Sequence, residues 1–152
     1  MECALTFYCL PFSKLSLQEL YDLMYLRQEV FVVEQDCPYI DADGKDPKAY
    51  HLLGYNKVGQ LLACARLLPA GVSYPGHASI GRVVTSPSLR GQGCGKLLMQ
   101  ESIAWCRRLF GESPIKISAQ CYLIHFYESF GFRTVGEEYL EDDIPHIAMV
   151  RD

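Results

Sequence analysis

RGQGCGKLLM, residues 90–99, places three glycines at alternate positions directly before a run of helical character. Glycine adopts backbone conformations that other residues avoid, and it lets a ligand approach the chain without meeting a Cβ atom. The first turn of a helix carries unpaired N–H groups and a partial positive charge, so it binds phosphate groups well. The stretch therefore predicts an anion-binding loop at the start of a helix over residues 94–109.

The spacing of the glycines excludes two common phosphate-binding loops. A P-loop needs its first glycine where this sequence has Arg90, and a hydroxyl residue where it has Leu97. The dinucleotide-binding fingerprint needs its last glycine at position 96 or 98, where Lys96 and Leu98 stand. A third kind of phosphate loop is therefore required.

The elements around this loop predict an α+β fold with a mixed sheet, because strands dominate the first half and a β-α-β unit follows. Ser16 and Glu19 form the capping box of a first helix. The sequence predicts helices over 16–31, 94–109 and 123–130, and strands within 1–14 and over 50–56, 60–68, 78–85, 115–120, 132–140 and 146–151. No repeat or change in composition divides the chain, so residues 1–152 are expected to form a single domain.

Composition and charge exclude several classes of protein. The 152 residues carry a net charge of −4 without a block of lysine or arginine, which argues against a nucleic-acid partner. No apolar run reaches the roughly 20 residues that span a bilayer. The first cation is Lys14, so the N-terminus lacks the basic start of a signal peptide. We therefore expect a cytoplasmic protein without a membrane partner.

Neither the cysteines nor the acidic segments have the spacing of a metal site. Seven cysteines without a Cys-x-x-Cys pair indicate buried, reduced thiols rather than a disulfide or zinc framework. The segment DADGKD, residues 41–46, departs from a calcium loop because Lys45 and Asp46 stand where an acid and a glycine are needed. The sequence thus predicts no metal.

Two signatures and four longer segments resemble a known family. Arg90-x-x-Gly93-x-Gly95 is similar to the pyrophosphate loop of GCN5-related N-acetyltransferases (GNAT), and FYESFGF, residues 126–132, resembles their second signature. The segments that resemble the bacterial ElaA-type branch are LRQEVFVVEQDCPYIDADGKD (26–46), IGRVVTSPSLRG (80–91), AQCYLIHFYESFGF (119–132) and EDDIPHIAM (141–149). The resemblance covers nearly the whole chain and implies a mostly antiparallel sheet of about seven strands flanked by helices, with the fourth and fifth strands splayed apart.

The resemblance also implies a donor, acetyl-coenzyme A (acetyl-CoA), used as cosubstrate, and direct transfer of its acetyl group to a primary amine in a ternary complex. Backbone groups of the fourth strand would place the thioester, and an amide there could stabilise the tetrahedral oxyanion. Gln120 stands where relatives often carry an asparagine that holds pantetheine. The residues expected to bind the donor are Val83, Val84, Thr85, Arg90, Gly91, Gln92, Gly93, Cys94, Gly95, Lys96 and Gln120.

Catalysis would need an acid for the leaving thiolate and a base for the amine. Tyr127 matches the tyrosine acid of the family. Deprotonating an amine with a pKa near 10.4 at pH 7 costs about 4.6 kcal/mol, so a base or a water chain is needed. Relatives often carry a glutamate on the fourth strand, which this chain lacks; Glu34 is the first candidate, followed by His146 and His51. Cys94 is not expected to act as a nucleophile, because the family forms no covalent intermediate.

The acceptor and two rival functions remain open. Two acidic stretches, residues 34–46 and 137–143, either attract a cationic small-molecule or peptide amine or are simply solvated loops. LRQEVFVVE, residues 26–34, is also similar to a region of acyl-homoserine-lactone synthases, which would favour a long-chain acyl donor. The non-enzymatic rival is a CoA-binding regulatory module, and a homodimer is conceivable under each function.

Overall fold

The structure is a computed structural model that describes residues 3–152. Its strands are β1 (Thr6–Pro11), β2 (Tyr50–Tyr55), β3 (Leu61–Leu68), β4 (Ser79–Thr85), β5 (Ile115–Gln120), β6 (Arg133–Glu141) and β7 (Ile144–Arg151). Its α-helices are α1 (Leu17–Arg27), α2 (Cys94–Phe110) and α3 (Ile124–Glu128). Its shorter helical segments are η1 (Phe12–Lys14), η2 (Gln28–Glu34), η3 (Asp46–Lys48), η4 (Pro87–Leu89) and η5 (Cys121–Leu123).

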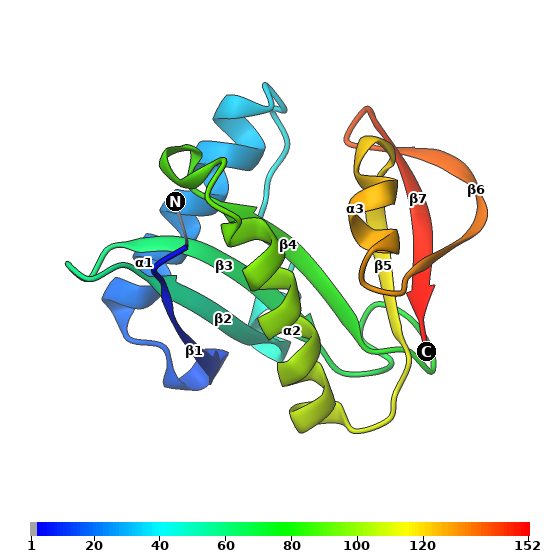
Figure 1. The fold of residues 1–152 in the computed structure, drawn as a ribbon, viewed down its shortest axis with the longest axis horizontal. Helices are drawn as coiled ribbons and strands as arrows, with labels where there is room; N and C mark the ends of the chain where they lie inside the picture. Colours follow the sequence, from blue (N-terminus) through cyan, green and yellow to red (C-terminus); the bar gives the residue numbers. More distant parts are fainter. Residues whose placement is uncertain (1–2) are drawn as a thin grey trace.

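The strands form two antiparallel sheets that meet at one point (Figure 1). One sheet has the order β1-β2-β3-β4 and the other β5-β7-β6. A parallel bridge between Ala78 and Ile115 joins them just before β4 and at the start of β5. The predicted α+β class, the seven strands and the splayed fourth and fifth strands are confirmed.

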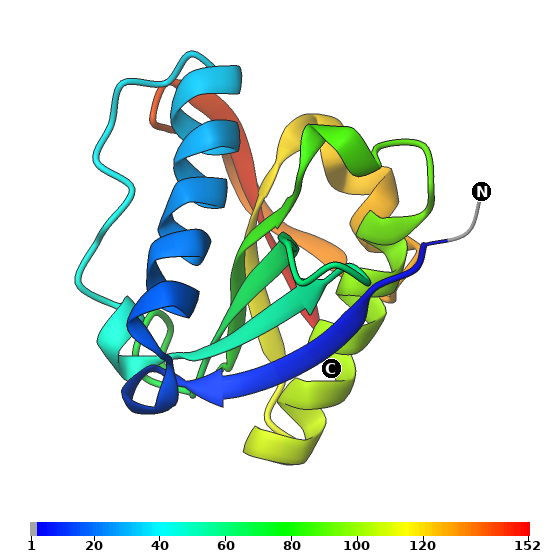
Figure 2. The same cartoon turned by 90° about the vertical axis from the view of Figure 1, so that its left-hand side faces the viewer.

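Helices cover both faces of the first sheet (Figure 2). Leu53 and Cys64 pack with α1, whereas their chain neighbours Leu52 and Ala63 pack with Leu98 of α2. Successive side chains of a strand point to opposite faces, so α1 and α2 lie on opposite sides of this sheet. None of the helices in residues 3–152 is both long and apolar enough to cross a bilayer.

The first helix begins as predicted and ends differently. Ser16 Oγ accepts a hydrogen bond from the Glu19 N–H at 3.0 Å, and the Ser16 N–H donates to Glu19 Oε1 at 2.8 Å. The helix was expected to reach residue 31, but α1 ends at Arg27 and η2 continues it as a π-helix. The N–H groups of Gln35 and Cys37 donate to carbonyls five residues earlier. Such wide turns often lie at functional sites.

The largest core cluster connects the two sheets. Met99 of α2, Ile117 of β5, Met149 of β7 and Phe132 are all buried in it. Because α2 packs on β4 while its cluster extends to β5 and β7, the helix fixes how the second sheet sits beside the first. The separation of β4 from β5 is therefore built into the core.

Candidate active site

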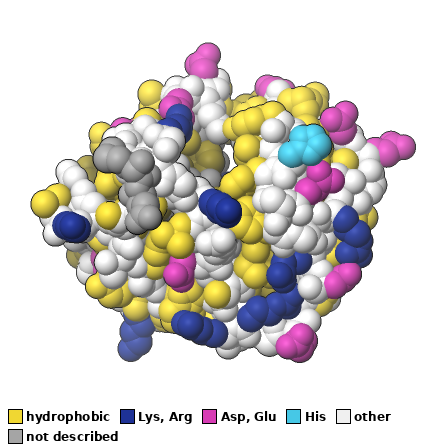
Figure 3. All heavy atoms as spheres, viewed as in Figure 1, with side chains coloured by type: hydrophobic (Ala, Val, Ile, Leu, Met, Phe, Trp, Pro, Cys, Tyr) yellow, Lys and Arg dark blue, Asp and Glu magenta, His cyan; other side chains and the backbone are white. Residues whose placement is uncertain are grey.

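A cleft of about 590 Å³ opens where β4 and β5 separate. The Ala78 N–H donates to the Pro114 carbonyl at 2.9 Å, and the Lys116 N–H donates to the Ala78 carbonyl at 2.8 Å. Beyond this junction β4 is the edge of its sheet, so the backbone groups on that side of Ser79–Thr85 face the cleft. Figure 3 shows the hollow between the half that carries β1–β4 and the half that carries β5–β7.

A bulge shapes the β4 wall of the cleft. The register between β3 and β4 shifts between Cys64 and Arg66, and Arg82 has a φ of +49°. Such a backbone conformation is uncommon for a residue other than glycine, and bulges often re-aim a strand beside a functional site. Val83, Val84 and Thr85, which we expect to bind the donor, follow the bulge and line the cleft.

The glycine loop is open on its outer side. Gly91 and Gly93 have φ values of +83° and +77°, and Gly93 is the N-cap of α2. No heavy atom lies within 4 Å of the place that a Cβ would take at Gly91, Gly93 or Gly95. Gly95 also lines the cleft. Glycine at these positions leaves a space beside the backbone that an anion can enter.

The first turn of α2 supplies the donors for such an anion. The first hydrogen bond of the helix runs from the Leu97 N–H to the Gly93 carbonyl at 3.2 Å, so the N–H groups of residues 94–96 precede it. Lys96 is exposed on this turn. Gln92 folds back, and its Nε2 donates to the Ser88 carbonyl at 3.5 Å. The loop thus combines bare amides, a helix N-terminus and a cation.

Two predicted site residues, Arg90 and Glu34, bind each other. The Arg90 guanidinium donates hydrogen bonds of 2.5 and 2.6 Å to the two carboxylate oxygens of Glu34, joining the glycine loop to η2. These hydrogen bonds lower the pKa of Glu34. A carboxylate that is neutralised in this way is a weaker base, and both side chains line the cleft.

Tyr127 lies on α3 with its ring packed edge-on against Phe126 and Phe132, at centroid distances of 5.2 and 6.1 Å. It lines the cleft and is only 9 % exposed. Burial raises the pKa of Tyr127 to about 12. The phenol therefore stays protonated at neutral pH and can donate a hydrogen bond into the cleft.

His146 and Gln120 face each other in the register of β7 and β5, and both line the cleft. Gln120 Nε2 donates to Gln35 Oε1 at 3.4 Å, so the predicted pantetheine ligand is tied to the residue after η2. His146 Nε2 lies 3.5 Å from Glu141 Oε2. The third candidate base, His51, is fully buried away from the cleft, with Nε2 3.0 Å from the Asp46 carbonyl oxygen. Burial lowers the pKa of His51, and its position excludes it as the base.

The acids of residues 34–46 are largely neutralised within the protein. Three arginines from α1, β3 and β4 hold three aspartates of this loop, in the ion pairs Arg27–Asp41, Arg27–Asp46, Arg66–Asp43, Arg66–Asp46, Arg82–Asp41 and Arg82–Asp43. Arg27 and Asp46 are buried. Together with the Arg90–Glu34 pair, this leaves the stretch 34–46 little net field with which to attract a cation.

The same loop is tied to the turn between β6 and β7. Tyr39 donates its hydroxyl hydrogen to Asp143 Oδ2 at 2.6 Å, and Cys37 Sγ contacts the Asp142 carbonyl oxygen at 3.4 Å. This turn lies on the side of the sheets that carries η2, whereas the glycine loop and α3 lie on the other side (Figure 2). The cleft therefore has the glycine loop and α3 on one side of the sheets, and η2 with the β6–β7 turn on the other.

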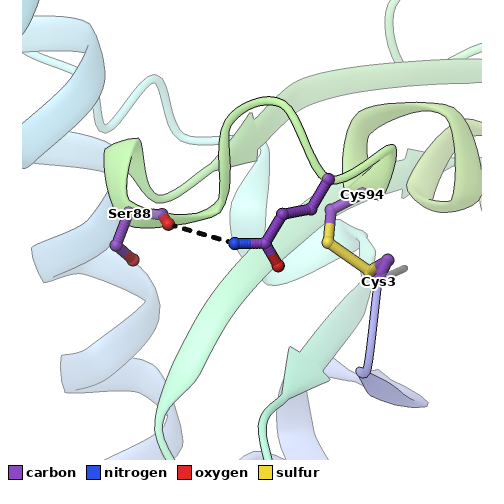
Figure 4. Close-up of a disulfide and its surroundings, with 4 residues drawn as sticks. Cys3, Ser88 and Cys94 are labelled. Atoms are coloured by element: carbon purple, nitrogen blue, oxygen red, sulfur yellow. Dashed lines mark hydrogen bonds between the residues drawn. A yellow bond between two sulfur atoms is a disulfide. The ribbon is translucent and has the colours of Figure 1, made fainter. Parts of the chain in front are cut away.

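Cys94, which we expected to be a reduced thiol, forms a disulfide with Cys3 (Figure 4). The prediction of reduced thiols is wrong for this pair. Their sequence separation of 91 hides this pairing, which arises because the segment before β1 passes beside the first residue of α2. The other cysteines of residues 3–152 are free. Burial raises the pKa of Cys64 and of Cys106 to about 12.

Sequence reasoning missed many of the cleft residues, among them Ser118 and Glu141. Ser118 Oγ donates to Glu141 Oε1 at 3.1 Å, across from β5 to β6. Ser118 stands on the alternating strand IKISAQ at a position that faces the same side as Gln120, which was the signal that could have found it. Glu141 belongs to the acidic stretch 137–143, for which the sequence suggested only an attraction of cations and no role for a single residue.

Comparison with known proteins gives one consistent family. Residues 31–152 match the family model described as an acetyltransferase (GNAT) domain. Protein ElaA of Escherichia coli is 44 % identical over 142 residues, which cover 92 % of each chain. A UPF0039 protein of Synechocystis is 42 % identical over 139 residues, which cover 91 % of this chain and 90 % of that one.

Solved structures agree with this assignment. An acyl-CoA N-acyltransferase from Pseudomonas aeruginosa superposes with a TM-score of 0.91 at 46 % identity, over 98 % of this chain and all of that one. The crystal structure of Escherichia coli ElaA gives 0.89 at 41 % identity, over 97 % and 99 % of the two chains. The AHL synthase LasI gives 0.75 at 15 % identity, over 96 % of this chain and 88 % of that one, a likeness of fold alone.

Proposed function

This chain belongs to the GNAT acetyltransferase family, and we propose that it transfers an acetyl group from acetyl-CoA directly to a primary amine. The observation that carries the proposal is the cleft between β4 and β5, which is lined by Arg90 and Gly95 of the glycine loop and by Tyr127 and reaches the opposite side of the sheets. A site of this form holds a long donor and leaves its reactive end open to a second substrate.

The residues present fit the donor. The pyrophosphate would bind the N–H groups of residues 94–96, where the space beside Gly91, Gly93 and Gly95 admits it. Arg90 would add its charge beside this group while it stays paired with Glu34. Pantetheine is an extended chain with two amides, and the free edge of Val83–Thr85 offers it backbone hydrogen bonds as a strand would.

The chemistry needs a proton at sulfur. The neutral amine attacks the thioester carbon, the C–N bond forms, and the C–S bond then breaks to release the thiolate of CoA. The Tyr127 hydroxyl would donate a hydrogen bond to this sulfur, and the proton still held by the attacking nitrogen completes the thiol. A phenol with a pKa of about 12 is a weaker acid than a simple thiol, so stabilising the charge on sulfur is its main contribution.

The test is thiol release by the purified protein with a library of primary amines and acyl-CoA donors of increasing chain length. We expect thiol release with at least one amine and a preference for acetyl-CoA. The Tyr127→Phe variant keeps the ring and removes only the hydroxyl, and it should release thiol far more slowly than the wild type. Tight binding of acetyl-CoA without turnover of any amine would instead favour a regulatory module.

The synthase alternative is weakened by the position of Arg27. This arginine belongs to the segment similar to acyl-homoserine-lactone synthases, but here it is fully buried and paired with Asp41 and Asp46. Its role is to hold the loop after η2, so it is not free to contact an acceptor. A preference for long-chain acyl donors in the same screen would reverse this conclusion.

A further inference from the structure

Four side chains of the second sheet form a connected group at the cleft: His146 on β7, Glu141 and Tyr139 on β6, and Ser118 on β5. Three of them, His146, Glu141 and Ser118, line the cleft. They lie at the end of the hairpin whose turn contacts the loop after η2. The donor chemistry described above uses none of them.

The backbone fixes the tautomer of His146. Its Nδ1 lies 2.7 Å from the carbonyl oxygen of Ile144. A carbonyl oxygen only accepts hydrogen bonds, so Nδ1 must carry the hydrogen, and the neutral ring keeps its lone pair on Nε2. Nε2 lies 3.5 Å from Glu141 Oε2, too far for a strong hydrogen bond. This nitrogen can therefore accept a proton.

The remaining members hold the pair in place. Ser118 Oγ donates to Glu141 Oε1 at 3.1 Å and is also hydrogen-bonded to the hydroxyl of Tyr139. The Tyr139 ring stacks on His146 with an interplanar angle of 24°. His146 is 6 % exposed, whereas the Glu141 side chain is 46 % exposed. A buried imidazole thus contacts a carboxylate that reaches water.

We propose that His146 Nε2 takes the proton of the acceptor ammonium and that Glu141 positions the ring and stabilises the imidazolium. The step balances: R–NH3⁺ gives one proton to Nε2 and becomes the neutral amine that attacks the thioester. The proton then leaves the imidazolium for water along the exposed Glu141 carboxylate. The inference rests on the proposed function, because it names the base for that reaction.

The surroundings favour this pair over Glu34. Two titratable groups lie beside His146, Tyr139 and Glu141 of β6. The other titratable or charged residues that line the same cleft are Glu34, Cys37, Tyr39, Asp41, Arg82, Arg90, Tyr122, Tyr127 and Asp142. The residues of β5 that pair with 146–148 are neutral. Within residues 3–152, only Glu141 offers a carboxylate oxygen within 4.0 Å of the ring nitrogens. Glu34 is instead occupied by Arg90.

The first test needs no acceptor. Nitrogen-15 NMR of the histidine rings, assigned with the His146→Gln variant, reports which nitrogen carries the hydrogen. We expect the Nδ1–H tautomer for the neutral His146 ring, in the wild type and in Glu141→Gln alike. An Nε2–H tautomer would overturn the inference, because the lone pair would then point at Ile144.

The second test is the pH dependence of kcat/KM with an amine found in the screen. We expect His146→Gln to lower kcat/KM about a hundredfold and to remove the acidic limb of the profile. Glu141→Gln should lower kcat/KM roughly tenfold, since the imidazolium that forms during the reaction loses its anion. Glu112→Gln, the matched charge removal in the exposed turn after α2, should leave kcat/KM and its acidic limb unchanged.

The outcomes separate the two proposals. An acetyl-CoA affinity equal to that of the wild type shows that each variant is folded with its donor site intact. Wild-type turnover with an acidic limb that persists in His146→Gln contradicts the inference and leaves the proposed function standing. A wild-type protein that binds acetyl-CoA and releases no thiol with any amine overturns both.

Discussion

Replacing Gly95 by alanine should raise stability and lower donor affinity. Gly95 is the second residue of α2, and its φ is not in the positive region that only glycine readily adopts. No heavy atom outside its own helix turn lies within 4 Å of the place that the new Cβ would take. The fold therefore accepts alanine without a clash, and any loss of binding arises from the ligand side.

The two effects have predictable sizes. Alanine is favoured over glycine within a helix by about 0.5–1 kcal/mol. For a domain of this length, 1 kcal/mol shifts the melting temperature by roughly 2–4 °C, so we expect a rise of about 1–4 °C. If the Cβ displaces the pyrophosphate from one backbone N–H, the lost charged hydrogen bond costs about 1.5–3 kcal/mol. That cost weakens acetyl-CoA binding roughly 10- to 150-fold.

Thermal denaturation without ligand and calorimetric titration with acetyl-CoA measure the two effects separately. Gly111→Ala is the control at the other end of α2, where φ is +67° and alanine should be destabilising by about 1–2 kcal/mol. It should leave the dissociation constant unchanged. A Gly95→Ala protein that binds acetyl-CoA as tightly as the wild type would falsify the placement of the pyrophosphate on this turn.

Three further predictions concern the cleft and its support. Tyr127→Phe should lower kcat about a hundredfold with an acetyl-CoA dissociation constant within twofold of the wild type, measured by thiol release and calorimetry. The pKa of Asp46 is lowered, because its arginine partners outweigh its burial. The stability that this carboxylate provides is therefore present above about pH 4 and is lost as the pH falls further. Asp46→Asn should lower the free energy of unfolding in urea by about 3 kcal/mol at pH 7 and flatten that acid dependence. Glu34→Gln frees Arg90 and should tighten acetyl-CoA binding roughly threefold, with turnover retained, whereas Glu29→Gln in the same short helix should change neither. Loss of turnover in Glu34→Gln would instead identify Glu34 as the general base.

The fold was predictable wherever the signal is local. The capping box at Ser16, the glycine that caps α2 and the alternation of Ile115–Gln120 each depend on residues within one turn or one strand. The end of α1 was not predictable, because η2 keeps helical periodicity while its hydrogen bonds change to five residues. The bulge at Arg82 was equally hidden, since a bulge depends on the register with β3.

The residues of the site also divide into those that a local motif predicts and those that depend on distant segments. Backbone groups that a short motif encodes, as in residues 90–96, can be found from the sequence because the chain must adopt one conformation there. Side-chain partners from distant segments cannot, because their pairing depends on which strands become neighbours. The Arg90–Glu34 pair joins residues 56 apart, and the disulfide of Cys94 spans 91 residues. The sequence predicted Glu34 and Arg90 as separate site residues and could not show that they form an ion pair with each other.

The proposed reaction therefore assigns donor and acceptor to different kinds of atoms. In the proposed complex the backbone amides of α2 and β4 would face the donor, so substitutions that keep the main-chain path should leave acetyl-CoA binding intact. The proposed acceptor side would consist of side chains of η2 and of the β6–β7 hairpin that line the cleft, such as Glu141 and His146. A change in one of these side chains alters charge and shape without moving the donor. Acceptor choice can therefore diverge within this fold while the donor remains the same, and experiments on the hairpin are the ones that will identify the amine.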